Sequence, residues 1–409
     1  MQAYSVVPYD VLFFRDNKSF TFGLWHTEGV FPPYPSTFQG FVRSKILTDN
    51  NLLDDKGKIN DDDGERAKTL VGDDYNLGIS INGPYLRDGR NDVIYFVRPS
   101  DLLRETEDSK GFHSVLAELK QDFESDLQFK LVQPKLPDGK LDKLYPPQFI
   151  SEKDLIKHLT TFSSFEISSP RQLVYTEDRV GIKLIVDKRK VEETKFYVTP
   201  YERFRQDVIH EGKQEKMRVG LYFETDAKEI KEGSLTLGSE SHLVYVGSLA
   251  NHKTLKNIFS GTRNTLVEAI EETSTFRMIL LQPGIFEFGW LPFQCRLDEK
   301  TQRLSLGADG IELILLYALI DSPIKIGGYS LDRNRGAKKW GDVKLKPMQN
   351  AVPAGSVYLF HIGKKVTDKQ IEDFVDRYNF GKIDHKPYSD MGFNQIVLGV
   401  GPRFKLEGD

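Results

Sequence analysis

The sequence predicts an α+β fold, because short segments with strand-like and helix-like apolar patterns alternate along the chain without a strict repeat. The chain has 409 residues, of which 39% are hydrophobic and 28% are charged. That composition is typical of a globular protein, and the length is sufficient for two domains with ample core.

The first half is expected to contain two helices among its strands. In order, the expected elements are a strand at 11–14, a helix at 37–47, a strand at 92–97, a helix at 112–127, a loop at 133–149, and a hairpin formed by 180–186 and 194–198. The second helix rests on apolar residues at helical spacing from Phe112 to Leu127. The hairpin rests on the alternation of Val180, Ile182 and Leu184 with other residues.

The second half is richer in strand-like segments. The expected strands are 217–223, 234–237, 243–246, 276–282, 312–320, 356–362 and 396–400. Residues 255–272 are expected to be helical, at least in part. A further helix is expected to begin at Thr367, because Gln370 follows at the spacing of a capping box.

The start of the first predicted helix is suited to an anion. Ser36 precedes an apolar run and Gln39 follows three residues later, which is the capping-box spacing. The first N–H groups of such a helix have no partner within it, and the helix dipole favours negative charge there. Thr37, Gly40 and Arg43 complete a candidate phosphate site, since Gly40 leaves one side open and Arg43 adds a cation. The alternative interpretation is an ordinary capped helix without a ligand.

A glycine-rich segment in the second half is the other candidate site. Gly327 and Gly328 can adopt positive φ and allow another backbone to approach closely. Tyr329 offers a flat face on which a base can stack. The basic residues expected to contact phosphate are Arg333, Arg335, Lys338 and Lys339. The alternative is a plain turn with a solvated basic arm, and the glycine spacing fits neither a P-loop nor the dinucleotide fingerprint.

Charge is unevenly distributed, although the net charge is only −4 and the pI is near 6.1. Residues 325–346 carry seven basic and two acidic side chains, a local charge of +5. Residues 49–74 carry nine acidic and four basic side chains, a local charge of −5. Ile59 and Leu70 occupy the first and last positions of the EF-hand pattern there, which excludes a calcium loop. This acidic segment is expected to be a solvated, mobile insertion.

Several classes of function are disfavoured by what the sequence lacks. The single Cys295 excludes an internal disulfide and a thiolate zinc cluster, and no motif for a metal or another cofactor is found. No apolar run approaches the roughly 18 residues of a membrane span, and no signal peptide is found. We therefore expect a cytoplasmic protein without a cofactor.

Catalysis and a second basic patch are the remaining alternatives. His26, close to the predicted anion-binding helix, is the histidine best placed for general acid–base chemistry. A lone histidine of this kind is more often a hydrogen-bonding or stacking residue, and it remains a candidate binding residue in that role. Lys188 and Arg189 at the tip of the predicted hairpin are also candidate phosphate contacts, or else they protect the edge of a sheet.

Five short motifs follow one another along most of the chain. They are 10–16 (DVLFFRD), 31–43 (FPPYPSTFQGFVR), 179–182 (RVGI), 237–241 (LGSES) and 326–329 (IGGY). In this order they resemble the RAMP proteins of CRISPR systems, and more narrowly the third subunit of the Cmr-type (type III-B) effector complex. Val180 departs from the family pattern, which has Thr there, and Ser239 and Ser241 depart from glycines.

The resemblance implies two ferredoxin-like domains of RNA-recognition-motif type, packed together. The first would span 1–215 with insertions near 49–74 and 100–165, and the second would span 216–409 and carry the glycine-rich loop 326–336. Arg15 and Arg179, which lie in two of the motifs, join the candidate RNA-binding residues.

The resemblance also implies a non-catalytic subunit, which holds the repeat-derived 5′ tag of the CRISPR RNA. Its protein partners would be the large polymerase-like subunit and the backbone RAMP subunits of the complex. Two alternatives come from other classes of function. One is a metal-independent endoribonuclease that processes CRISPR precursor RNA, and the other is a purely structural partner without RNA contact.

Overall fold

The computed structural model describes most of the chain, and the statements on structure refer to that part. The described residues are 1–15, 29–54, 57–73, 76–104, 111–114, 119–120, 129–134, 149–161, 165–166, 173–185, 190–210, 213–216, 218–228, 230–250, 252–328, 346–363 and 366–404.

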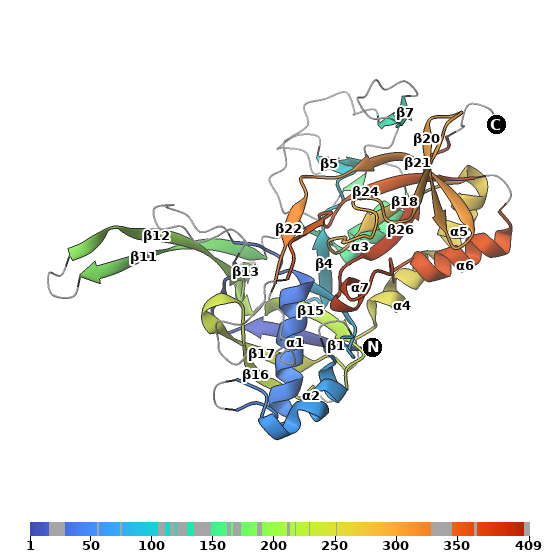
Figure 1. Ribbon diagram of the computed structural model, residues 1–409. Coiled ribbons are helices and arrows are strands. Elements are labelled where there is room, and N and C mark those ends of the chain that lie inside the picture. The colour runs from blue at the N-terminus through green and yellow to red at the C-terminus, as the bar shows by residue number, and fades with distance from the viewer. Residues whose placement is uncertain are drawn as a thin grey trace.

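Two antiparallel sheets dominate the structure, and the first lies below the second in the view of Figure 1. The first sheet has the spatial order β16 (Gly233–Leu237), β17 (His242–Ser248), β1 (Gln2–Pro8), β15 (Val219–Thr225), β3 (Ile81–Asp88), β4 (Val93–Val97) and β9 (Phe149–Ser151). The second has the order β19 (Cys295–Asp298), β20 (Arg303–Ala308), β21 (Ile311–Leu319), β24 (Val357–Ile362), β18 (Thr275–Leu280), β26 (Gln395–Val400) and β25 (Gly381–Lys382).

The strand order of both sheets is that of a ferredoxin-like fold. In the first sheet β17, β1, β15 and β3 are neighbours, and in the second sheet β26, β18, β24 and β21 are neighbours. Numbered along the chain, each set of four has the order 4-1-3-2 with antiparallel pairing, as in a β-α-β-β-α-β unit. The first crossover of the first sheet carries helix α1 (Pro35–Asp49), and the second crossover of the second sheet carries helix α6 (Asp368–Tyr378). The expected α+β, ferredoxin-like fold is confirmed.

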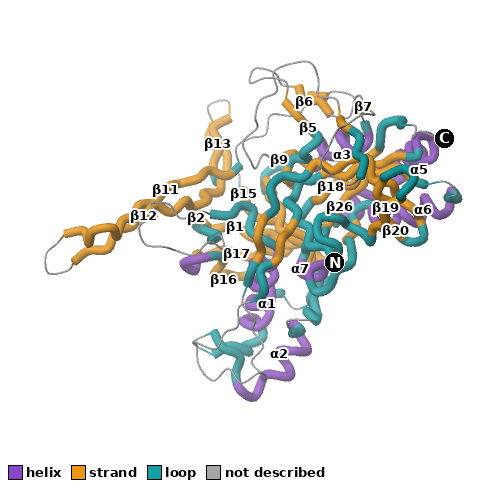
Figure 2. The backbone as a smooth tube through the Cα atoms, turned by 45° about the horizontal axis from the view of Figure 1, so that its top comes forward, coloured by secondary structure: helices purple, strands orange, loops and turns teal. Residues whose placement is uncertain are grey.

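The remaining elements are smaller and lie around these sheets, except for one long hairpin. The hairpin of β11 (Val174–Ile185) and β12 (Lys190–Phe204) projects away from both sheets in Figures 1 and 2. The other strands are β2 (Val11–Leu12), β5 (Leu102–Arg104), β6 (Gly111–Ser114), β7 (Leu119–Lys120), β8 (Gln133–Pro134), β10 (Phe165–Glu166), β13 (Asp207–His210), β14 (Lys213–Lys216), β22 (Ile324–Ile326) and β23 (Gln349–Ala351). The other helices are α2 (Gly64–Val71), α3 (Glu152–Thr160), α4 (Leu255–Phe259), α5 (Arg263–Thr273) and α7 (Tyr388–Met391).

Three apolar clusters hold these layers together. One lies between the first sheet and helices α1 and α2, and a second lies between the second sheet and helices α5 and α6. The third joins the two sheets, because it contains Tyr85 and Tyr222 from the first half together with Ile279, Val357 and Val397 from the second. The two halves therefore share a continuous buried interface.

Two expectations about the first half are wrong. The segment predicted as an amphipathic helix at 112–127 contains strands β6 and β7 in its described part, since short apolar runs do not separate helix from strand by spacing alone. The acidic segment 49–74 is not simply a solvated insertion, because it forms helix α2, whose Ala67 and Val71 are buried against α1 and the first sheet.

The boundary between the sheets also differs from the expected junction near residue 215. Strands β15, β16 and β17 all belong to the first sheet, so the chain passes to the second sheet between Ser248 and Thr275. Pairing of β1 with β15 and β17 joins segments more than 200 residues apart, and no local pattern in the sequence marks it. The assignment of domains to residue ranges remains a proposal.

Candidate functional site

Helix α1 begins two residues earlier than the capping-box pattern predicts. The N-cap is Tyr34, Pro35 occupies the first turn, and no side chain caps the helix. Proline favours the first helical position because its φ is already helical and its missing N–H would have had no partner there. Ser36 is consequently inside the helix, and the predicted Ser36–Gln39 capping box is wrong.

The uncapped start leaves backbone donors available at the end of a fifteen-residue helix. Ser36 and Thr37 lie in the first turn, where N–H groups have no intrahelical acceptor. The first turn contains no acidic side chain that would compete with an external anion. The positive end of the helix dipole and the first N–H groups of α1 are therefore suited to an anionic ligand.

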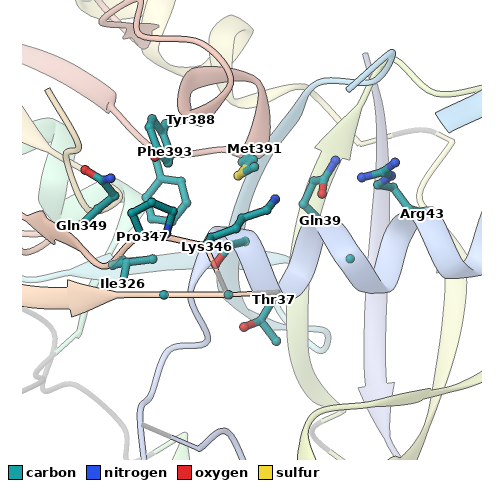
Figure 3. Close-up of a pocket in the computed structure, with 14 residues that line it drawn as sticks. Thr37, Gln39, Arg43, Ile326, Lys346, Pro347, Gln349, Tyr388, Met391 and Phe393 are labelled. Atoms are coloured by element: carbon teal, nitrogen blue, oxygen red, sulfur yellow. The ribbon is translucent and has the colours of Figure 1, made fainter. Parts of the chain in front are cut away.

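The two predicted sites meet in one pocket of about 270 Å³. Figure 3 shows Thr37, Gln39 and Arg43 on α1 opposite Ile326 at the end of β22, with Lys346 extending toward the helix. Gly327 and Gly328 line the same pocket. Segments nearly 300 residues apart in the sequence thus line one pocket, which neither motif alone predicted.

Gln39 is the least satisfied polar side chain of this pocket. It is only 3% exposed, and its Nε2 has no hydrogen-bond partner within the described part of the chain. A buried amide donor without an acceptor destabilises a fold, which points to a ligand acceptor that completes it. Sequence reasoning assigned Gln39 to a capping box and so missed this role.

The pocket is cationic. Arg43 and Lys346 both line it, and none of its described lining residues is acidic. The Arg43 guanidinium also donates to the backbone carbonyl of Gly72 at 3.0 Å, which ties α1 to the end of α2. An apolar part of the wall comes from Tyr388 and Met391 in α7 and from Phe393 just after it, three residues that no sequence motif marked.

The glycines that line the pocket leave space for a ligand, but they do not adopt a backbone conformation that requires glycine. Neither Gly327 nor Gly328 adopts positive φ, contrary to the expectation. A Cβ added to Gly328 would meet only the Cδ of Lys346 at 3.9 Å, and a Cβ added to Gly40 would meet no atom within 4 Å. The amide of Lys346 donates to the carbonyl of Gly328 at 2.9 Å, which fixes the two sides of this segment.

Arg179, also a candidate RNA contact, is engaged elsewhere. On the projecting hairpin its guanidinium contacts Glu177 at 2.7 Å and Asp10 at 3.2 Å. Hydrogen bonds from Arg203 and Arg179 lower the pKa of Glu177 to about 2, so this carboxylate stays ionised beside them. Arg179 does not line the pocket.

The other candidates are not brought into the pocket by the described structure. Arg15 is exposed and pairs through its backbone with Gly29. Outside the described residues lie His26, Lys188, Arg189, Tyr329, Arg333, Arg335, Lys338 and Lys339.

The strand order is the ferredoxin-like order expected of a RAMP-class protein, the class that the sequence motifs resemble. The family model described as CRISPR-associated protein (Cas_Cmr3) matches residues 4–401, so the chain belongs to this family. The resemblance drawn from the motifs is thereby confirmed. No curated protein sequence matches the chain.

Solved structures of CRISPR complexes contain similar chains. A chain of the type III-B Cmr-beta complex bound to cognate target RNA and AMPPnP (state 1) has a TM-score of 0.44 and 14% identity, covering 97% of this chain and 98% of that chain. A chain of Cmr-beta bound to cognate target RNA has a TM-score of 0.43 and 14% identity, with 97% and 96% covered. A chain of the type III-A Csm3–Csm4 subcomplex has a TM-score of 0.28 and 13% identity, with 90% and 96% covered.

In the described part of the chain, no helix is long and apolar enough to cross a membrane.

Proposed function

We propose that this chain is a non-catalytic RNA-binding subunit of a type III-B CRISPR effector complex, in which it holds the 5′ repeat-derived tag of the CRISPR RNA. The observation that carries the proposal is the meeting of the uncapped α1 start, the buried Gln39 amide and two cations in one pocket whose described lining contains no acidic side chain. Each of these features favours an anion, and a phosphate of the RNA backbone supplies acceptors for all of them.

The pocket holds RNA in register without reading its sequence. Backbone N–H groups and cations contact phosphate oxygens, which carry no information on the base. The apolar wall beside α7 limits access of water and strengthens these contacts.

The test is binding of fluorescently labelled tag RNA to the purified chain and to the assembled complex. Gln39→Leu removes the orphaned donor, so we expect RNA affinity to fall about tenfold, as for a hydrogen bond to a charged group. Stability should not fall, because the change also removes an unsatisfied buried amide. Gln294→Leu, at an exposed position that does not line the pocket, is the matched control. Equal RNA affinity of both variants would refute the proposal.

The chain acts by holding RNA, not by cutting it. The described lining of the pocket contains no histidine, aspartate or glutamate, the residues that most often act as general acid or base. The competing endoribonuclease hypothesis rests on His26. We expect purified chain to leave labelled repeat RNA intact and His26→Ala to cause no accumulation of precursor RNA in cells; cleavage that the substitution abolishes would establish the competing function.

Family membership supports the place of the chain in the effector complex, with the large polymerase-like subunit and the backbone RAMP subunits as its partners. Co-purification from cells that express the complex tests this, because the large subunit should be lost when this chain is omitted. Recovery of a complete complex without the chain would contradict it. Crosslinking of tag RNA within the complex separates an RNA-holding subunit from a purely structural one.

A further inference from the structure

A second cavity, of about 380 Å³, lies between the two halves of the molecule. Tyr34, Tyr85 and Tyr95 contribute rings from the first half, and Gln282 and Pro353 lie opposite in the second half. We call it the aromatic cavity. Cavities of this size with mainly aromatic and apolar walls and a few fixed polar groups are typical binding sites for small planar groups.

The rings that line the aromatic cavity are held in place by their neighbours. Phe31 lies edge-on to Phe149, with ring centroids 6.2 Å apart, and edge-on to Phe204, with centroids 5.7 Å apart. The ring of Tyr85 packs on Phe96 with a centroid distance of 4.8 Å. Walls that are already ordered lose little entropy when a ligand enters, so the cavity is pre-organised.

One polar group of the cavity is also fixed. Gln282 is 5% exposed, and its Nε2 donates to the carbonyl of Pro84 at 2.7 Å, which sets the orientation of the carboxamide. Arg98 and Asp321 carry the only opposite charges of the described lining, so the cavity has no net charge. The phosphate pocket described above is cationic by contrast. A neutral, planar group with a polar edge fits the aromatic cavity, and a phosphate does not.

The two cavities are neighbours along both of their walls. On one wall, Tyr34 lines the aromatic cavity and Ser36 lines the phosphate pocket. On the other wall, Ile324 lines the aromatic cavity and Ile326 lines the phosphate pocket. The step from Ile324 to Ile326 in strand β22 spans about 7 Å, and the step from Tyr34 to Ser36 is shorter because Pro35 and Ser36 are helical. The sugar of one nucleotide can therefore link a phosphate in the first site to a base in the second.

We propose that the aromatic cavity receives one unstacked base of the RNA whose phosphate occupies the pocket at α1. This inference rests on the proposed RNA-binding function and adds to it a contact at the base. Single-stranded RNA is commonly bound in this manner, with splayed bases stacked on aromatic rings and hydrogen-bonded at their edges.

The test uses the full chain and a series of tag RNAs, each lacking the base at one position. We expect loss of one particular base to weaken binding about tenfold, as for loss of one stacked base, with smaller effects elsewhere. Ala354→Phe, which adds a ring at a half-buried lining position, should weaken intact RNA by the same factor. The same variant should bind the RNA that lacks the critical base as well as wild type does. Ser322→Trp at the exposed rim of the cavity provides a second blocking variant if Ala354→Phe does not fold.

The two proposals fail in different ways. If every base-deficient RNA binds wild type equally well, or if the blocking variants weaken intact and base-deficient RNA equally, the base contact is refuted and the phosphate contact stands. Lys346→Gln at the phosphate pocket should weaken all the RNAs by similar factors. If wild type binds none of the RNAs, both proposals are refuted.

Discussion

Arg277 on β18 donates to Asp101 of the first half at 2.7 Å, and both side chains are completely buried. Nε2 of His158 on α3 lies 2.8 Å from the Asp101 carboxylate and 2.8 Å from Nη1 of Arg277. The guanidinium makes a further bond to the carbonyl of Val400 at 2.9 Å. This ionic cluster joins the two halves beside their shared apolar interface, and so it holds together the two sides from which the phosphate pocket is built.

Asp101→Asn should destabilise the whole protein. The amide keeps the shape of the side chain but leaves the buried guanidinium without a counter-charge, a change that costs about 3–5 kcal/mol of the free energy of unfolding. Urea denaturation measures this difference. Asp178→Asn, at an exposed position on the projecting hairpin, is the control and should stay within about 0.5 kcal/mol of wild type. A similar small effect for Asp101→Asn would show that the ion pair is dispensable.

Stability should fall as the solution becomes mildly acidic. Burial lowers the pKa of His158 below its usual value near 6.5, because the imidazolium would lose its hydration in the interior. As the pH falls through the usual pKa of histidine, the imidazole binds a proton in the unfolded chain but not in the folded chain. The free energy of unfolding therefore decreases from about pH 7 toward pH 5. His158→Gln should therefore make the urea midpoint of unfolding depend less on pH in this window. If the urea midpoint of the variant changes with pH as steeply as that of wild type, His158 is not the group responsible.

Asp101 does not titrate in the same window. Burial alone would raise its pKa, but the hydrogen bonds and charges of His158 and Arg277 lower the pKa well below the usual range. Its stabilising contribution is therefore fully present above about pH 4 and is lost only as the pH falls further, toward the folded-state pKa.

Local sequence patterns predicted most of the local structure but not all of it, and two capping-box patterns illustrate the difference. Thr367 and Gln370 form the expected box at the start of α6, with both reciprocal hydrogen bonds present. Ser36 and Gln39 have the same spacing but form none, because α1 starts at Pro35, two residues earlier. One neighbouring proline thus decided whether the pattern became a cap or part of the lining of a pocket.

Contacts between distant segments could not be predicted in this manner. The sequence marked α1 and the glycine segment separately, but the pocket exists because the two sheets share a buried interface. Lys346, Tyr388, Met391 and Phe393 carry no motif, and their role follows only from tertiary packing. The pairing of β1 with β15 and β17 is non-local for the same reason, and no local pattern marks residues 248–275, where the chain passes from the first sheet to the second.

Gly328→Val should weaken RNA binding without unfolding the protein. The backbone at Gly328 has no positive φ, and an added Cβ meets only the flexible end of Lys346, so the side chain is tolerated. Its methyl groups occupy space in the phosphate pocket, and we expect affinity for tag RNA to fall about tenfold, roughly 1.4 kcal/mol. Gly307→Val on β20 is the matched control, since an added Cβ there also meets nothing and the site is remote from the pocket. Unchanged RNA affinity together with a normal thermal melt would refute this expectation.

Arg43→Ala should separate the structural and the RNA-binding contributions of one side chain. Loss of the 3.0 Å bond to the carbonyl of Gly72 loosens α1 from α2 and should lower the free energy of unfolding by about 1.5–3 kcal/mol. Loss of one phosphate contact should weaken tag and scrambled RNA equally and reduce the slope of log affinity against log salt by about 0.7. Arg43→Lys retains the charge but not the fork of donors, so it should restore most of the salt slope while stability stays reduced. A salt slope equal to wild type in Arg43→Ala, combined with reduced stability, would assign Arg43 to bracing α1 alone and leave the α1 start, Gln39 and Lys346 as the phosphate contacts.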